Sequence, residues 1–188
     1  MELQTRRLGG LKLINISPSQ WQFLSANNKG EFIFGTYIAT ANHHQVKIIK
    51  PRYRIGETVY IKEAFEIIDD YGDTATIHFP STREQLLLSG LGITHKHWLT
   101  DRYGKMISPL FMPEWAARYF IVITDVRAER LQEINYWDAG KEGLDDVLPE
   151  WMRLAEFHKL WNSINKEKWE SNPWVEVDTF RKQEMPGT

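Results

Sequence analysis

The stretch Met112-Pro-Glu-Trp-Ala-Ala-Arg-Tyr-Phe-Ile-Val-Ile-Thr-Asp-Val-Arg-Ala-Glu-Arg-Leu-Gln-Glu-Ile134 combines a turn, a strand and the start of a helix in one run. Residues 119–126 within it are almost all β-branched or aromatic, which is too apolar on both faces for an edge strand. We therefore predict a central strand of a covered or closed sheet. Pro113 suits the first position of a short helical turn, where a missing N–H costs nothing. Beyond the strand, charged side chains are expected to face water: Arg127, Glu129 and Arg130.

Alternating and helical periodicities recur on both sides of this stretch. Strands are predicted for a hairpin of 32–39 and 46–50, and for 58–65, 74–79 and 174–180. Helices are predicted after the capping box Ser81-Thr-Arg-Glu84, and at 136–143 and 149–164. A loop is expected around 95–98. Together these short strands, interleaved with short helices, predict an α+β domain with a mixed, mostly antiparallel, barrel-like sheet.

Length and composition limit the classes of function. The 188 residues suit one domain, placed at 1–182 with a tail at 183–188. There is no cysteine, which excludes disulfides and thiolate chemistry. No run of residues is long and apolar enough for a membrane helix, so we expect a cytoplasmic protein with no membrane partner. Its oligomeric state is left open.

The charge is distributed unevenly along the chain. Residues 1–62 carry 9 Lys and Arg against 3 Asp and Glu, a net charge of +6, whereas residues 63–188 carry 14 against 22, a net charge of −8. This asymmetry predicts a positive surface for phosphates in the N-terminal third. The alternative is that the blocks mix in space and the charges are simply solvated. His43-His44 and His95-x-His97 lack a carboxylate at fixed spacing, so neither a metal nor another cofactor is expected.

Several segments, in order, resemble one family. They include Gln4-Thr-Arg-Arg7, Ile55-Gly-Glu-Thr-Val-Tyr-Ile-Lys-Glu-Ala-Phe65, Met112-Pro-x-Trp-Ala-x-Arg118, Thr124-Asp-Val-Arg-x-Glu-Arg-Leu-Gln-x-Ile134, Leu160-Trp-Asn-Ser-Ile-Asn165 and Asn172-Pro-Trp-Val175. In this combination the chain looks like the phage and prophage proteins of the ASCH group (activating-signal-cointegrator homology) within the PUA-like superfamily. The resemblance implies a PUA-like β-barrel with flanking helices, whose cleft recognises RNA or a modified nucleobase. It also implies a protein in the cytoplasm of a bacterial host.

The cleft motif of that family, Gly-x-Lys-x-x-Thr-x-Arg, is only partly present. Thr5 matches its threonine and Arg7 its arginine, but Glu2 stands at the lysine position, and the glycine position would precede Met1. Some relatives resemble amidohydrolases that use a lysine, a threonine and a glutamate on an acylated cytosine. Here Thr5 and Glu63 are the candidate catalytic residues, since Glu63 falls on the apolar face of the predicted strand. The enzyme alternative is thus a hydrolase of a modified nucleobase or nucleoside, or a ribonuclease.

A nucleic-acid-binding module requires less of the sequence and is the predicted function: binding of RNA or single-stranded nucleic acid in a basic cleft. Arginines and lysines would contact phosphates, while Tyr53, Tyr60 or Trp115 would stack on a base. The candidate contacts are Arg6, Arg7, Lys50, Arg52, Tyr53, Arg54, Lys62, Trp115 and Arg118. Alternatively, the indole of Trp115 fills the core and Arg118 pairs with a carboxylate such as Glu114. A third hypothesis is that the chain is a phage accessory factor that binds a host protein.

Overall fold

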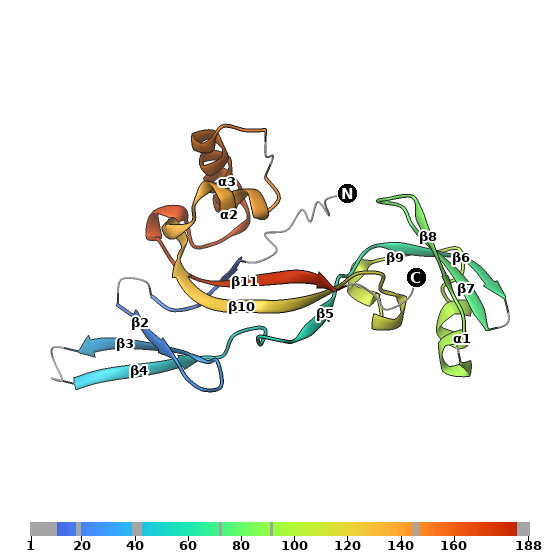
Figure 1. Cartoon of the computed structure of the whole chain (residues 1–188), viewed down its shortest axis with the longest axis horizontal. Helices are drawn as coiled ribbons and strands as arrows, with labels where there is room; N and C mark the ends of the chain where they lie inside the picture. Colours follow the sequence, from blue (N-terminus) through green and yellow to red (C-terminus); the bar gives the residue numbers. More distant parts are fainter. Residues whose placement is uncertain are drawn as a thin grey trace. The chain divides into compact units, whose positions relative to one another are not determined.

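The computed structural model describes residues 11–17, 20–38, 43–71, 73–90, 92–144 and 147–183. They form an α+β fold of mostly antiparallel strands, with a curled half-barrel sheet and few helices (Figure 1). The chain divides into two compact units. Unit 1 comprises Met1–Glu57 and Ile123–Phe180, and unit 2 comprises Thr58–Val122 and Arg181–Thr188. The boundary of a single domain at residue 182 stays a prediction.

Unit 1 is built on a sheet in which β11 (Trp174–Gln183) lies between β1 (Leu11–Leu13) and β10 (Phe120–Arg130). β1 runs antiparallel to β11, with Leu11 opposite Val177 and Leu13 opposite Val175. The valines of β11 pack into one apolar cluster, while Trp174 packs into a second one. Both faces of this part of β11 are therefore covered. The organising strand β10 lies between β11 and β5, which confirms its predicted position inside the sheet.

Two helices cover the valine face of this sheet: α2 (Tyr136–Lys141) and α3 (Glu150–Ile164). Asn135 caps α2, its side-chain oxygen accepting from the N–H of Asp138 at 3.0 Å. On α3, Phe157 and Trp161 are fully buried, but Trp151 and Ile164 at its two ends are 69% and 57% exposed. Both helices confirm the prediction, although the predicted apolar stripe is buried only in its middle. Short 3₁₀ turns, η4 (Leu131–Glu133) and η5 (Trp169–Ser171), precede α2 and follow α3.

The other face of the sheet packs against a three-stranded sheet of order β2 (Gln22–Ala26), β3 (Phe32–Ile38) and β4 (His43–Ile49). β3 and β4 are antiparallel, which confirms the predicted hairpin. Phe32 and Phe34 are buried, and the Phe34 ring meets the Trp174 indole edge-on at 5.3 Å. This aromatic contact joins the hairpin to β11.

Unit 2 contains a second antiparallel sheet and a separate core. The strand order is β8 (Glu84–Leu88), β7 (Thr74–Phe79), β6 (Phe65–Tyr71) and β9 (Met106–Ile107). β5 (Thr58–Tyr60) pairs with the first residues of β10. Also present are α1 (Ile93–Thr100) and the 3₁₀ turns η2 (Pro109–Phe111) and η3 (Glu114–Ala116). The core contains Phe65, Ile67, Ile77, Phe79 and Leu99.

Some local predictions were wrong. The capping box does not open a helix: Leu86–Leu88 lie in β8, with Leu87 opposite Thr76 and exposed while Leu86 and Leu88 pack inward. Three consecutive leucines fit a strand as well as a helix, and the neighbouring strand β7 decides. Residues 95–98, expected in a loop, belong to α1. The predicted strand 58–65 divides into β5 and the start of β6, and Pro113 caps η3 instead of opening it.

Within the described ranges, no helix is both long enough and apolar enough to cross a bilayer.

The buried indole of Trp161 ties α3 to the chain that follows it. Its Nε1 donates to the carbonyl of Glu167 at 2.8 Å, and the residue is 1% exposed. Trp161→Phe should keep most of the apolar contact but leave that carbonyl unpaired, and it should reduce the free energy of unfolding by about 1–3 kcal/mol. Urea denaturation measures this, with the exposed Trp151→Phe as the matched control. An equal effect at both positions would contradict the role given to the hydrogen bond.

Candidate functional site

Unit 1 contains a pocket of about 380 Å³ between the sheet and α2. Its volume falls in the range of small-ligand sites. Apolar side chains from β1, β11 and the η4 region line it: Leu11, Leu131, Ile134, Val175 and Val177. Charged side chains from β10, α2 and β11 complete the lining. The pocket can therefore take a small ligand with an apolar body and polar edges.

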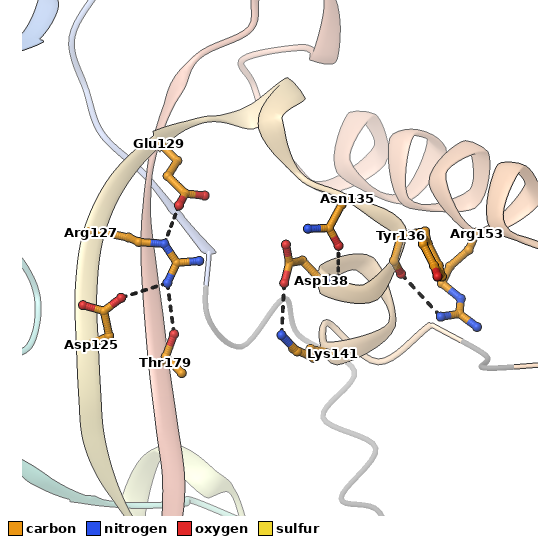
Figure 2. Close-up of polar contacts among 9 residues, drawn as sticks. All are labelled: Asp125, Arg127, Glu129, Asn135, Tyr136, Asp138, Lys141, Arg153 and Thr179. Carbon is orange, nitrogen blue, oxygen red and sulfur yellow. Dashed lines mark hydrogen bonds and ion pairs between the residues drawn. The ribbon is translucent and has the colours of Figure 1, made fainter.

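Arg127 on β10 is the most firmly held of these charged groups. Its Nε donates to Glu129, and its Nη1 donates to Asp125 at 3.0 Å and to the Thr179 hydroxyl at 3.1 Å (Figure 2). Asp125, Arg127 and Glu129 occupy alternate positions of one strand, so their side chains share a face. The hydrogen bond with Glu129 outweighs burial and raises the pKa of Arg127 above its ordinary value. The guanidinium is thus charged and fixed in place.

Helix α2 provides the opposite wall of the pocket. Figure 2 shows Asp138 projecting from α2 toward Arg127. One oxygen of Asp138 accepts from the Lys141 ammonium at 3.1 Å, one helical turn away. Because Asn135 caps the helix at the N–H of Asp138 itself, the carboxylate is carried by an ordered first turn.

The charge of the lining disfavours an anion in the pocket. Three cationic residues line it, Arg127, Arg130 and Lys141, against four acidic ones, Glu129, Asp138, Glu142 and Asp178. The guanidinium of Arg130 lies over the Trp174 ring, at 4.2 Å from its centroid. Carboxylates on several sides favour a neutral ligand that carries N–H donors.

Asp178 on β11 is a buried carboxylate at the edge of this pocket. It is 8% exposed, and within the described residues its Oδ1 has no hydrogen-bond partner. Burial raises its pKa to about 6, helped by the charge of Glu176 and opposed by those of Arg52 and Lys12. Glu176, also buried, accepts from the backbone N–H of Arg52 at 2.7 Å and lies 3.6 Å from the Lys12 ammonium. The charge of Arg52 thus reaches a residue of the pocket.

The predicted contacts of the 50–54 segment lie in unit 1. Lys50, Arg52 and Arg54 are exposed, and the guanidinium of Arg52 lies over the Tyr53 ring, at 4.9 Å. The Arg54 N–H is held by the Glu57 carboxylate at 2.9 Å. The chain therefore presents three cations and one ring on a short segment that is anchored at Glu176 and Glu57.

The other predicted residues lie in unit 2, where Glu63 and Arg118 form an ion pair. Both oxygens of Glu63 accept from Arg118, at 2.8 and 2.7 Å, and the two side chains are only 11% and 9% exposed. Glu84 pairs with the same guanidinium, which lies over the Phe79 ring at 4.0 Å. Burial alone would lower the pKa of Arg118, but the hydrogen bonds and charge of Glu63 raise it overall. Arg118 thus pairs with Glu63 and Glu84, and not with the suggested Glu114.

Lys62 and Trp115 also make local contacts in unit 2. The Lys62 ammonium donates to the Leu110 carbonyl at 3.3 Å and lies over the Tyr60 ring. The Trp115 indole packs on the core, edge-on to Trp98 at 5.4 Å. These contacts agree with the core alternative for Trp115, and a stacking role for it stays a prediction.

The remaining predictions concern residues outside the described ranges: Thr5, Arg6 and Arg7. Their convergence with Glu63 and Arg118, and the catalytic pair Thr5 and Glu63, therefore stay predictions. Among the described residues, no group of three or more His, Asp or Glu side chains is arranged to hold a metal ion.

Sequence reasoning missed the pocket. Arg127 and Glu129 were expected to face water, and Asp138 and Lys141 were read only as part of a helix. The alternation of acid, base and acid at 125, 127 and 129 is a sequence signal for a clamped arginine. It does not reveal which element faces the clamp.

Comparison with family models, with curated proteins and with solved structures finds no match for this chain.

The buried Asp178 predicts a pH-dependent stability. Because its pKa in the folded state, about 6, lies above the ordinary value, the free energy of unfolding falls as the pH rises from about 4 to about 6. Asp178→Asn removes the cost of ionisation and should stabilise the protein by up to about 3 kcal/mol at pH 7.5, with no gain at pH 3.5. Denaturant titrations at both pH values measure this. The exposed Asp73→Asn should change stability by less than about 0.5 kcal/mol at either pH. A gain at Asp178 that is independent of pH would contradict the assignment.

The ion pair of unit 2 predicts a different response. Glu63→Gln leaves Arg118 largely buried with one partner fewer, so the free energy of unfolding should fall by up to about 3 kcal/mol at pH 7. The exposed Glu114→Gln is the matched control and should have little effect. If both substitutions are equally neutral, Glu63 does not stabilise the fold, and its assignment as a site residue gains weight.

Proposed function

We propose that this chain is a phage-type ASCH/PUA-like protein that binds RNA or single-stranded nucleic acid and takes one base into the pocket of unit 1. The observation that carries the proposal is the pocket itself: about 380 Å³, with an apolar floor and polar walls that include a fixed arginine. A nucleobase has the matching form, a planar apolar body with donors and acceptors on its edges.

The charge pattern supports a base inside the pocket and phosphates outside it. The acidic excess among the lining residues opposes a buried phosphate. The exposed cations of the 50–54 segment are available for phosphates, and the charge of Arg52 acts on Asp178 at the pocket. Tyr53, which lies beneath the Arg52 guanidinium, is a half-exposed ring on which a neighbouring base could stack.

The family motif supports the same location by its place in the sequence. Thr5 and Arg7 precede Leu11, a lining residue, by six and four positions. In the proposal, the cations Arg6 and Arg7 add phosphate contacts to those of Lys50, Arg52 and Arg54. A modified base is included among the proposed ligands because the resemblance implies it.

Salt dependence tests the proposal. Affinity for a short single-stranded RNA, measured by fluorescence anisotropy, should fall with salt at a log–log slope of about −0.7 for each phosphate contacted. The double substitution Arg52→Ala and Arg54→Ala should weaken binding to every sequence and make the slope shallower by about 1.4.

The matched control is Lys159→Ala on α3, an exposed cation that already pairs with Glu156 at 2.7 Å. It should leave both affinity and slope unchanged. Absence of RNA and single-stranded DNA binding at low salt would remove the proposed function. Binding that is insensitive to the double substitution would move the phosphate contacts to another surface.

A further inference from the structure

Two polar atoms face one another across the pocket and are not used by the fold. Glu129, Asp125 and Thr179 occupy Nε and Nη1 of Arg127, which leaves Nη2 without a hydrogen bond inside the described residues. Lys141 uses one lone pair of Oδ1 of Asp138, so this oxygen can accept a second hydrogen bond, and Oδ2 makes no hydrogen bond to the described chain. Figure 2 shows these two groups directed toward each other from β10 and α2. The pocket thus has a donor on one wall and an acceptor on the other.

We infer that the pocket selects guanine, with Arg127 donating to the O6 and N7 edge and Asp138 accepting from N1–H and the 2-amino group. This inference rests on the proposed function and names its ligand. Guanine places two acceptors on one edge and two adjacent donors on the edge that pairs with cytosine. An arginine and a carboxylate on opposite walls complement both edges at once.

The other bases fit this arrangement less well. Adenine and cytosine carry an amino donor where guanine or uracil carries a carbonyl, so this donor would face the Arg127 donor. Uracil offers an acceptor to Arg127 and one N–H to Asp138, but its second carbonyl would lie against the carboxylate. Of the four bases, only guanine places no donor against Arg127 and no acceptor against Asp138.

The fixed geometry of both walls strengthens the selection. Arg127 is held by three acceptors and Asp138 by Lys141 and by the cap of α2, so little side-chain freedom is lost when a ligand binds. A base with the wrong edge cannot be accommodated by a simple swing of the guanidinium, because the clamp from Asp125 and Glu129 would have to break. The pocket therefore rejects the other bases in two ways: they make fewer contacts, and they leave donors or acceptors of the pocket without a partner.

The test compares four RNA octamers that differ only at one central base: guanine, adenine, cytosine or uracil in a background of uracil. Fluorescence anisotropy at one salt concentration should show the guanine octamer binding about tenfold more tightly than each of the others, in line with one or two well-oriented base contacts. An octamer with hypoxanthine in place of guanine lacks the 2-amino group and should lose part of that advantage.

Two variants assign the contacts. Arg127→Gln should reduce the guanine preference to less than about twofold. Asp138→Asn, on the surface helix, should bind guanine and hypoxanthine about equally, because the amide can no longer accept from two donors. Lys159→Ala should retain the wild-type preference. Circular dichroism establishes that each variant is folded, and hypoxanthine provides a change on the ligand side that does not depend on folding.

The outcomes separate the two proposals. Salt-dependent binding of all four octamers with equal affinity overturns the guanine inference and leaves the proposed function standing. A guanine preference that survives both Arg127→Gln and Asp138→Asn also overturns it, because guanine is then read elsewhere. If no octamer binds, both the proposed function and the inference are removed.

Discussion

The burial of both faces of β11 over residues 174–178 constrains the rest of unit 1. Alternate residues of this strand point to opposite sides, so Val175 and Val177 pack under the helices while Trp174 packs against the β2–β3–β4 sheet. A strand buried on both faces usually carries apolar residues throughout. β11 instead places Glu176 and Asp178 on the Trp174 face, and two carboxylates are taken into the interior.

The two carboxylates are accommodated unequally. Glu176 accepts from the Arg52 backbone and lies near Lys12, whereas Oδ1 of Asp178 has no hydrogen-bond partner among the described residues. Burial and the repulsion from Glu176, its neighbour on the same strand face, both raise the pKa of the Asp178 carboxyl. The ionised Asp178 therefore lowers the stability of the fold, and it does so beside the pocket. That is where a protein can tolerate a locally unfavourable group if the site requires it.

Local patterns were sufficient for the elements whose own residues decide their structure. The hairpin of β3 and β4, the strands β7 and β11, and helices α2 and α3 follow from periodicity and caps in their own sequences. Strand β8 does not follow from its own sequence, because Leu86–Leu88 fits a helix as well as a strand. Its pairing with β7, a tertiary contact, decides between the two. α1 was missed because its eight residues, with two histidines and few apolar positions, give no clear helical pattern.

The candidate site was harder to predict for a related reason. Glu63 could be singled out because a carboxylate on the apolar face of a strand needs a partner, and it has one in Arg118. The identity of that partner, 55 positions along the chain, does not follow from spacing. Likewise, the charges at 125, 127 and 129 predict a shared face of β10. Only the packing of α2 over the sheet turns that face into the wall of a pocket.

The two clamped arginines show why the pocket, and not the predicted glutamate, is the better candidate for binding. Glu63 engages Nε and Nη2 of Arg118 and Glu84 engages Nη1, so each nitrogen of that guanidinium has a carboxylate, and aromatic rings lie against its face. A ligand at Nε or Nη2 of Arg118 would have to displace the Glu63 carboxylate, which is already desolvated, and this costs more than a new hydrogen bond returns. Arg127 is also held through two of its nitrogens, but its third faces a cavity. A charged donor that is fixed and still has one direction open is prepared to bind a ligand, whereas a fully paired one stabilises the fold.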